Sequence, residues 1–295
     1  MKRILGAAIG GIFFLGAGGA FAAPPTPGQH FNCSDGGSGV SCAADDGGCV
    51  SNTKNHLKCS DGESKAFGKA VAAVIKCHIK QADAAFKTLN GKPTTFDEEG
   101  CENAAIAKLS ATRAKIEGKA ICDPQQINNF NVEQAVLFNH PPPAPALSID
   151  GQNGNTYCDS TSGAMIDGGP GGDDPGWVPN SAPNLKCADT VAKMLSRLVG
   201  AVIKCHIKLN DSDFKGKDFD EESCEETNPS QKGALDKFNQ QRDKLAQLAI
   251  CPPCLDSAHI NALGASALGQ LDGANGSAYP CNLGSPSGAF IDPLY

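Results

Sequence analysis

The residues best suited to chemistry lie in an octapeptide that occurs twice. Residues 73–80 and 201–208 both have the sequence AVIKCHIK, so each copy places a cysteine directly before a histidine. Covalent haem attachment normally requires the motif C-x-x-C-H. Val74 and Val202 stand where the first cysteine of that motif belongs. The doublets therefore fail as haem sites at a required residue, and no cofactor is predicted.

The histidine of each doublet has a candidate acidic partner. A disulfide between the neighbouring cysteines would place His78 next to Glu102, and the second copy would place His206 next to Glu225. A histidine paired with a carboxylate on a half-buried seam has its polar groups satisfied. A structural role is therefore favoured, and these pairs are the first place to look for a functional site.

An arginine occupies an apolar-seam position in each copy. Arg113 and Arg242 follow the same three-and-four spacing as the apolar residues around them, although arginine resists burial. We favour the interpretation in which the aliphatic stem packs and the guanidinium reaches water. The alternative is an anion or carboxylate clamp repeated once per copy, because the guanidinium fork suits bidentate recognition.

The remaining motifs favour structural roles over catalysis or metal binding. Cys251 and Cys254 form a single C-x-x-C pair, whereas structural zinc sites use such pairs in couples, and Cys251 follows a helix instead of starting one as reactive thiols do. The Asp- and Gly-rich stretches 45–48, 150–154 and 167–174 lack the calcium-loop pattern and are predicted to be turns and linker. We predict no catalytic residue and no metal ligand, and an enzyme is not favoured.

The elements that must position these residues are predicted to be helices. From Glu63 to about Leu89 the apolar positions step by three and four, as on one face of a helix. Asp97 and Asp220 can each cap a second helix. A shorter third helix is expected after Pro124 or Pro253. The positions on the first seam are Phe67, Val71, Val74 and His78 in one copy, and Leu195, Val199, Val202 and His206 in the other.

The cysteine spacing predicts how the two long helices of each copy are joined. Cys59 and Cys77 are 18 residues apart, which is roughly 27 Å along a helix and too far for a disulfide. Two antiparallel helices bring together instead the cysteines at each end of the hairpin. The predicted disulfides are Cys59–Cys122, Cys77–Cys101, Cys187–Cys251 and Cys205–Cys224. A six-residue surplus around 226–229 requires a local break in the second copy.

The other cysteines are harder to assign. We predict Cys254–Cys281 within the second copy, because Gln125 stands at the position in the first copy that corresponds to Cys254. The pairing of Cys33, Cys42, Cys49 and Cys158 is left open.

The N-terminus and the overall charge restrict location and partners. Lys2 and Arg3, an apolar stretch and Ala20-Phe21-Ala22 are typical of a secretory signal cleaved near Ala22. Fourteen cysteines fit an oxidising compartment, so a secreted or periplasmic protein without a membrane span is predicted. The net charge of −7 disfavours nucleic-acid binding.

The sequence thus predicts an all-α protein made of two tandem, disulfide-stapled, antiparallel helical hairpins with irregular Gly- and Pro-rich straps and linker. The expected division is a signal peptide 1–22, a Cys-rich strap 23–58, repeat one 59–167, a linker 168–186 and repeat two 187–295. We predict a non-enzymatic binding or scaffold protein for an unknown protein or small ligand. The alternatives are a disulfide-rich inhibitor or toxin-like effector and, third, a haem or metal carrier.

Overall fold

The computed structural model describes residues 47–138, 148–167, 174–217, 219–281, 283–285 and 288–289. The predicted signal peptide and two of the fourteen cysteines, Cys33 and Cys42, lie outside these ranges. Within them no helix combines the length and the apolar composition needed to cross a bilayer.

The first repeat forms the predicted hairpin and a third helix. Helix α1 (Lys54–Leu89) begins where the Thr53 side chain accepts a hydrogen bond from the His56 amide, well before the predicted start at Glu63. Helix α2 (Glu98–Glu117) starts at the predicted cap, because the Asp97 side chain accepts from the Gly100 amide. Helix α3 (Pro124–Leu137) follows, with proline in its first turn.

The second repeat is built in the same order with two differences. Helix α5 (Ala182–Phe214) starts inside the predicted linker, and α6 (Glu222–Glu225) is separated from α7 (Ala234–Leu248) by the expected break. Helix α8 (Ser257–Ala278), the third helix of this repeat, is longer than α7, with 22 residues against 15. The prediction that the third helix is the shorter one is therefore wrong in the second repeat. The sequence of α8 has no proline, whereas prolines follow α3 at 141–143.

Short elements complete the described chain. A one-turn helix, α4 (Asn153–Thr156), and a 3₁₀ turn (Ser160–Ser162) follow α3 within the first repeat, and a second 3₁₀ turn (Pro253–Leu255) precedes α8. Strands β1 (Gly284–Ser285) and β2 (Gly288–Ala289) form a two-residue antiparallel ladder. Apart from this short ladder, the named elements of the described chain are helices, and the all-α fold class predicted from the sequence is confirmed.

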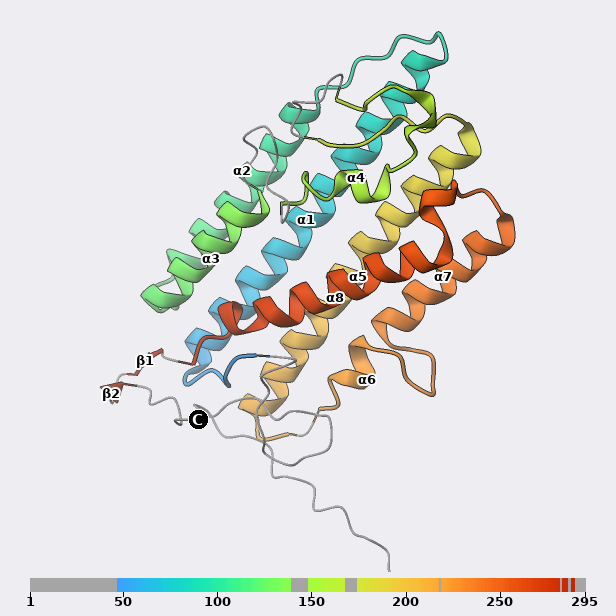
Figure 1. Cartoon of the computed structure of the whole chain (residues 1–295). Coiled ribbons are helices and arrows are strands. Elements are labelled where there is room, and N and C mark those ends of the chain that lie inside the picture. The colour runs from blue at the N-terminus through green and yellow to red at the C-terminus, as the bar shows by residue number, and fades with distance from the viewer. Residues whose placement is uncertain are drawn as a thin grey trace, which may run out of the picture.

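The two hairpins pack against each other along their longest helices. Figure 1 shows α1 and α5 side by side and running in opposite directions. Gly68 of α1 faces Ile203 of α5, and a Cβ atom at Gly68 would lie 3.0 Å from Ile203 Cδ1. One buried cluster joins Ala82 of the first repeat to Val191 and Leu198 of the second. The repeats thus share a core and form one body in which each is the approximate twofold partner of the other.

All four predicted hairpin disulfides are present. They are Cys59–Cys122, Cys77–Cys101, Cys187–Cys251 and Cys205–Cys224. The predicted Cys254–Cys281 bridge is wrong, because Cys254 pairs with Cys158 and Cys281 pairs with Cys49. Both observed bridges connect the end of one repeat to the other repeat or to the segment before α1. Such pairs depend on how the hairpins face each other, which the spacing of cysteines in one hairpin does not encode.

Two buried tyrosines also connect the end of one repeat to the other repeat. The Tyr157 hydroxyl donates to Asp189 of α5 over 3.0 Å, and the Tyr279 hydroxyl donates to Asp61 of α1 over 3.2 Å. Each tyrosine lies near the end of one repeat and bonds the long helix of the other, as expected for an approximate twofold arrangement. Burial is the main reason that the pKa of Asp61 is raised to about 6, and the charge of Asp211 adds to it against Lys65, Tyr279 and Lys215.

Stability is therefore expected to fall as the pH rises through the range in which Asp61 ionises in the folded state. The folded chain keeps a proton between about pH 4 and 6 that the unfolded chain releases, so folding is favoured at the acidic end. Asp61→Asn removes this penalty, and the variant should gain about 2 kcal/mol over the wild type at pH 7.5 but little at pH 4. Urea unfolding at both pH values measures it. The exposed Asp243→Asn is the control, and an equal gain at both pH values would contradict the assignment.

Candidate functional site

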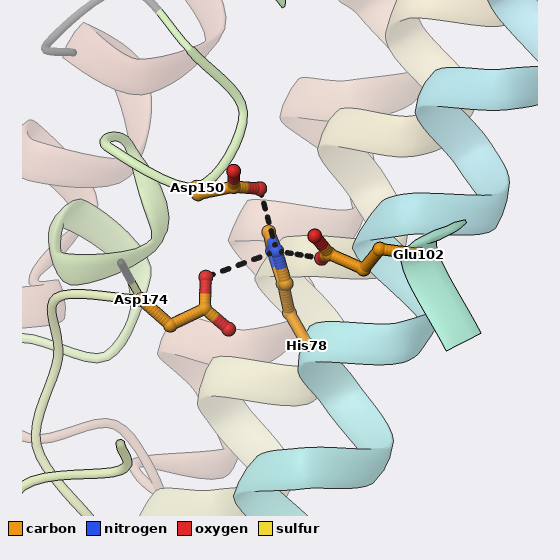
Figure 2. A group of neighbouring side chains, drawn as sticks. All are labelled: His78, Glu102, Asp150 and Asp174. Carbon is orange, nitrogen blue, oxygen red and sulfur yellow. Dashed lines mark hydrogen bonds and ion pairs between the residues drawn. The ribbon is translucent and has the colours of Figure 1, made fainter. Parts of the chain in front are cut away.

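His78 lies at the centre of a buried group of carboxylates. Its Nε2 atom is 2.7 Å from Glu102 Oε1, 3.1 Å from Asp174 Oδ1 and 3.2 Å from Asp150 Oδ1. Glu98 Oε1 lies slightly farther away, at 3.8 Å. Figure 2 shows three of these side chains approaching the imidazole from different sides. All five residues are buried.

The group draws on four separate parts of the chain. His78 projects from α1, and Glu98 and Glu102 lie one turn apart near the start of α2. Asp150 lies just before α4, and Asp174 precedes α5. The Cys77–Cys101 disulfide joins the residues directly before His78 and Glu102, so it fixes α1 and α2 at the height of the site.

The second repeat contains an equivalent group around His206. Its Nε2 atom lies 3.2 Å from Glu225 Oε2, 3.5 Å from Asp272 Oδ1 and 3.6 Å from Glu221 Oε1. These carboxylates occupy the positions that correspond in sequence to Glu102, Asp150 and Glu98. The adjacent Cys205–Cys224 disulfide is also repeated. The arrangement is thus duplicated with the fold.

The first group contains more acidic side chains than one imidazole can neutralise. Burial alone lowers the pKa of His78, but hydrogen bonds with Asp150 and Glu102 and the charge of Asp174 outweigh it and raise the pKa to about 10. Burial, the hydrogen bond with Glu102 and the charge of Asp174 raise the pKa of Glu98 to about 11. One Nε2–H has only one proton to donate, so carboxylates this close must share protons or bind a cation.

The oxygen and nitrogen atoms are close enough to surround a metal ion. In His78, Glu102, Asp150 and Asp174, one ligand atom from each residue lies within 4.8 Å of the others, and the same holds for His206, Glu225 and Asp272. A metal bound to ligands at about 2 Å would hold them at such separations. Neither group includes a thiolate, because the neighbouring cysteines are in disulfides.

Sequence reasoning placed each His beside one Glu but missed the other carboxylates. The structure does bring His78 to Glu102 and His206 to Glu225. The stretches 150–154 and 167–174, predicted to be turns and linker, supply Asp150 and Asp174. A signal for Asp150 and Asp272 was present, because residues 150–157 and 272–279 share the pattern D-G-x-N-G-x-x-Y, but Asp174 lies outside this pattern.

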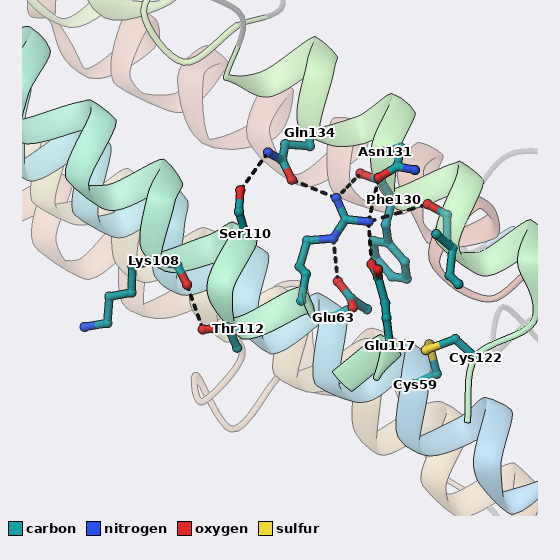
Figure 3. A network of polar contacts seen from close by, with 12 residues as sticks. Cys59, Glu63, Lys108, Ser110, Thr112, Glu117, Cys122, Phe130, Asn131 and Gln134 are labelled. Atoms are coloured by element: carbon teal, nitrogen blue, oxygen red, sulfur yellow. Dashed lines mark hydrogen bonds and ion pairs between the residues drawn. A yellow bond between two sulfur atoms is a disulfide. The ribbon is translucent and has the colours of Figure 1, made fainter. Parts of the chain in front are cut away.

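Each nitrogen of the Arg113 guanidinium donates hydrogen bonds within the protein. Figure 3 shows the side chains that surround it, among them Glu63 of α1, Glu117 of α2 and Gln134 of α3. Nε donates to Glu63 over 2.9 Å, Nη2 to Glu117 over 3.0 Å, and Nη1 to Gln134 over 2.7 Å. Nη1 also donates to the Phe130 carbonyl, and Nη2 to the Asn131 side chain. The expected reach to water is wrong for Arg113, which is only 5 % exposed, and its donors leave no room for an anion.

Arg242 differs from its counterpart. It contacts Asp243 of the same helix and the side chains of Asn239 and Asn261, and its side chain is partly exposed. Val191 occupies the α5 position that corresponds to Glu63, so α5 offers Arg242 no acid at that position. The prediction that the head group reaches water therefore describes Arg242, and the two arginines form no repeated clamp.

No known protein family, curated protein or solved structure was found to match the chain.

Proposed function

We propose that this is an exported binding protein in which each repeat holds one divalent metal cation. The observation that carries the proposal is the convergence of several buried carboxylates on one imidazole nitrogen, in both copies of a duplicated fold. Surface acid clusters are common without a ligand, but these acids are buried, and burying uncompensated charge is costly. A divalent ion supplies the positive charge that the imidazole alone lacks.

The donor set favours a first-row ion such as Mn²⁺, Fe²⁺ or Zn²⁺. Carboxylate oxygens suit Mn²⁺ as well as Ca²⁺ and Mg²⁺, while an imidazole nitrogen suits Fe²⁺ and Zn²⁺. A mixed set without thiolate argues against copper(I). Because the ligands are buried and come from the protein, the sites resemble closed binding centres more than catalytic ones, which keep a position open.

The disulfides and the N-terminal sequence support export as part of the proposal. Six disulfides among the described residues fit an oxidising compartment. Residues 1–22 have the charged start, apolar stretch and Ala-Phe-Ala ending of a cleaved signal, so the mature protein is proposed to be secreted or periplasmic. Mass spectrometry of the mature N-terminus tests the cleavage near Ala22.

Metal titration of the mature protein tests the proposed function. Protein stripped with a chelator and titrated with Mn²⁺ should bind two ions per chain, counted by electron paramagnetic resonance and by elemental analysis. Each filled site should raise stability by about 2.7 kcal/mol when free ion is 100-fold above the dissociation constant. His78→Ala and His206→Ala should each remove one ion.

The control is His259→Ala, because this half-buried histidine bonds the Asn155 carbonyl outside both groups. It should leave the count at two. If the wild type binds no ion above a buffer blank, or if the double variant His78→Ala/His206→Ala still binds two, the carboxylates share protons instead and the proposal is wrong.

A further inference from the structure

A mostly apolar cavity of about 460 Å³ lies between the two repeats. One face of α1 and the same face of α5 line it at positions that correspond in the duplication. These are Phe67, Val71 and Ile75 on α1, and Leu195, Val199 and Ile203 on α5. The size falls in the range of small-molecule sites, which protein folds often place where two units meet.

The cavity is long, and its other walls are also largely apolar. Its α1 side runs from Ser64 to His78, which is roughly 20 Å along a helix. Phe130 of α3 and Leu271 of α8 contribute to the remaining lining. An occupant that fills this space must therefore be elongated and predominantly apolar.

Two buried asparagines give the cavity a specific polar feature. Asn153 and Asn275 line it, are 5 % and 2 % exposed, and occupy the same position of the repeated D-G-x-N-G-x-x-Y pattern. Among the described residues the Nδ2 atom of each, and also the Oδ1 atom of Asn275, has no hydrogen-bond partner. A buried amide without a partner is costly, so each of these donors calls for an acceptor that a ligand can supply.

We propose that this cavity binds an elongated, uncharged, largely apolar molecule that carries a carbonyl or hydroxyl oxygen. The two Nδ2 donors require an acceptor, which a bare ammonium group lacks. An anion would supply one, but the carboxyl group of Glu133 in the lining disfavours a second acidic group there. A neutral oxygen on a long apolar body meets both conditions. This site does not depend on metal binding by the two His centres.

Dye binding and competition test the ligand class with the mature protein. Nile red, which is uncharged and carries a carbonyl, should bind once per chain with a blue-shifted emission. Dodecanol, dodecanoate and dodecylammonium share one chain length and differ in head group. Dodecanol should displace the dye at a concentration at least about 10-fold lower than either charged competitor. Dodecylammonium cannot accept the hydrogen bond, which is worth about that factor, and dodecanoate places a negative charge near Glu133.

Variants locate the binding in this cavity. Val199→Trp fills its middle and should weaken dye binding at least 10-fold, whereas Val132→Trp, at an exposed α3 position outside the lining, should not. Ala267→Phe narrows the cavity from α8 and serves if the first variant unfolds. Asn275→Leu should weaken dodecanol about 10-fold without lowering the unfolding temperature. Absence of dye binding, indifference to both filling variants, or preference for a charged competitor would overturn the proposal.

Discussion

Arg113→Met is expected to lower the free energy of unfolding by about 3 to 5 kcal/mol, the usual cost of breaking a buried ion pair by removing one partner. The substitution keeps most of the apolar stem but deletes the hydrogen bonds to Glu63, Glu117 and Gln134 (Figure 3). Glu63 would then be a buried acid without its cation. Burial already raises the pKa of Glu63 to about 7 against the opposing charge of Arg113. Urea unfolding with the disulfides intact measures the loss.

The second repeat provides the matched controls. Arg242→Met should cost less than about 1 kcal/mol, because this arginine is partly exposed and its acidic partner is on the surface. Glu63→Val copies the residue found at Val191, and the double variant Glu63→Val/Arg113→Met should recover much of the stability lost in Arg113→Met. Additive losses would show that Glu63 and Arg113 are not energetically coupled.

Glu102→Gln is expected to weaken one of the two metal sites strongly and to stabilise the metal-free protein. The amide keeps the size of the side chain but removes one negative charge 2.7 Å from His78 Nε2. Metal affinity at that site should fall roughly 100-fold or more. Changing a residue that only hydrogen-bonds to a metal ligand already costs up to about 100-fold, and Glu102 is proposed to be a ligand itself. The chelated variant should unfold at higher temperature than the chelated wild type, because the carboxylates no longer repel each other as strongly.

Opposite signs for binding and stability distinguish a metal site from a purely structural cluster. Glu225→Gln should give the same pair of results at the His206 group, and exposed Glu99→Gln on the same helix as Glu102 should change neither quantity. Loss of stability in the chelated Glu102→Gln protein, with two Mn²⁺ ions still bound, would refute the assignment. Isothermal titration and thermal unfolding of the same samples provide both measurements.

The parts of the fold that could be predicted are those set by neighbours along the chain. Three-and-four spacing and the Asp97 cap are local signals, and they correctly placed the hairpins. The hairpin disulfides followed because a helix has a fixed rise per residue, so cysteine separations translate into distances. The same reasoning brought His78 to Glu102, since each directly follows a bridged cysteine.

The parts that failed depend on surfaces meeting over long separations. Whether a seam arginine reaches water depended on a partner from another helix, and Glu63 provides it in the first repeat only. Cys254 was predicted to pair with Cys281 of its own repeat, but it pairs with Cys158 of the first repeat, because the end of the first repeat packs against the second. The repeated D-G-x-N-G-x-x-Y pattern marked residues that matter, without indicating that its aspartate would reach a histidine some 70 positions away.

By itself, then, the sequence determined the duplication, the helices, their hairpin disulfides and one His–Glu contact per repeat, because each of these follows from periodicity or from distance along a rigid helix. Only the tertiary structure decided that α1 and α5 pack antiparallel (Figure 1). This packing creates the shared cavity and brings together Cys158 and Cys254, which form a disulfide between the repeats. The physical reason is that the docking of two helix faces depends on the fit of side chains distant in sequence. No local pattern records that fit.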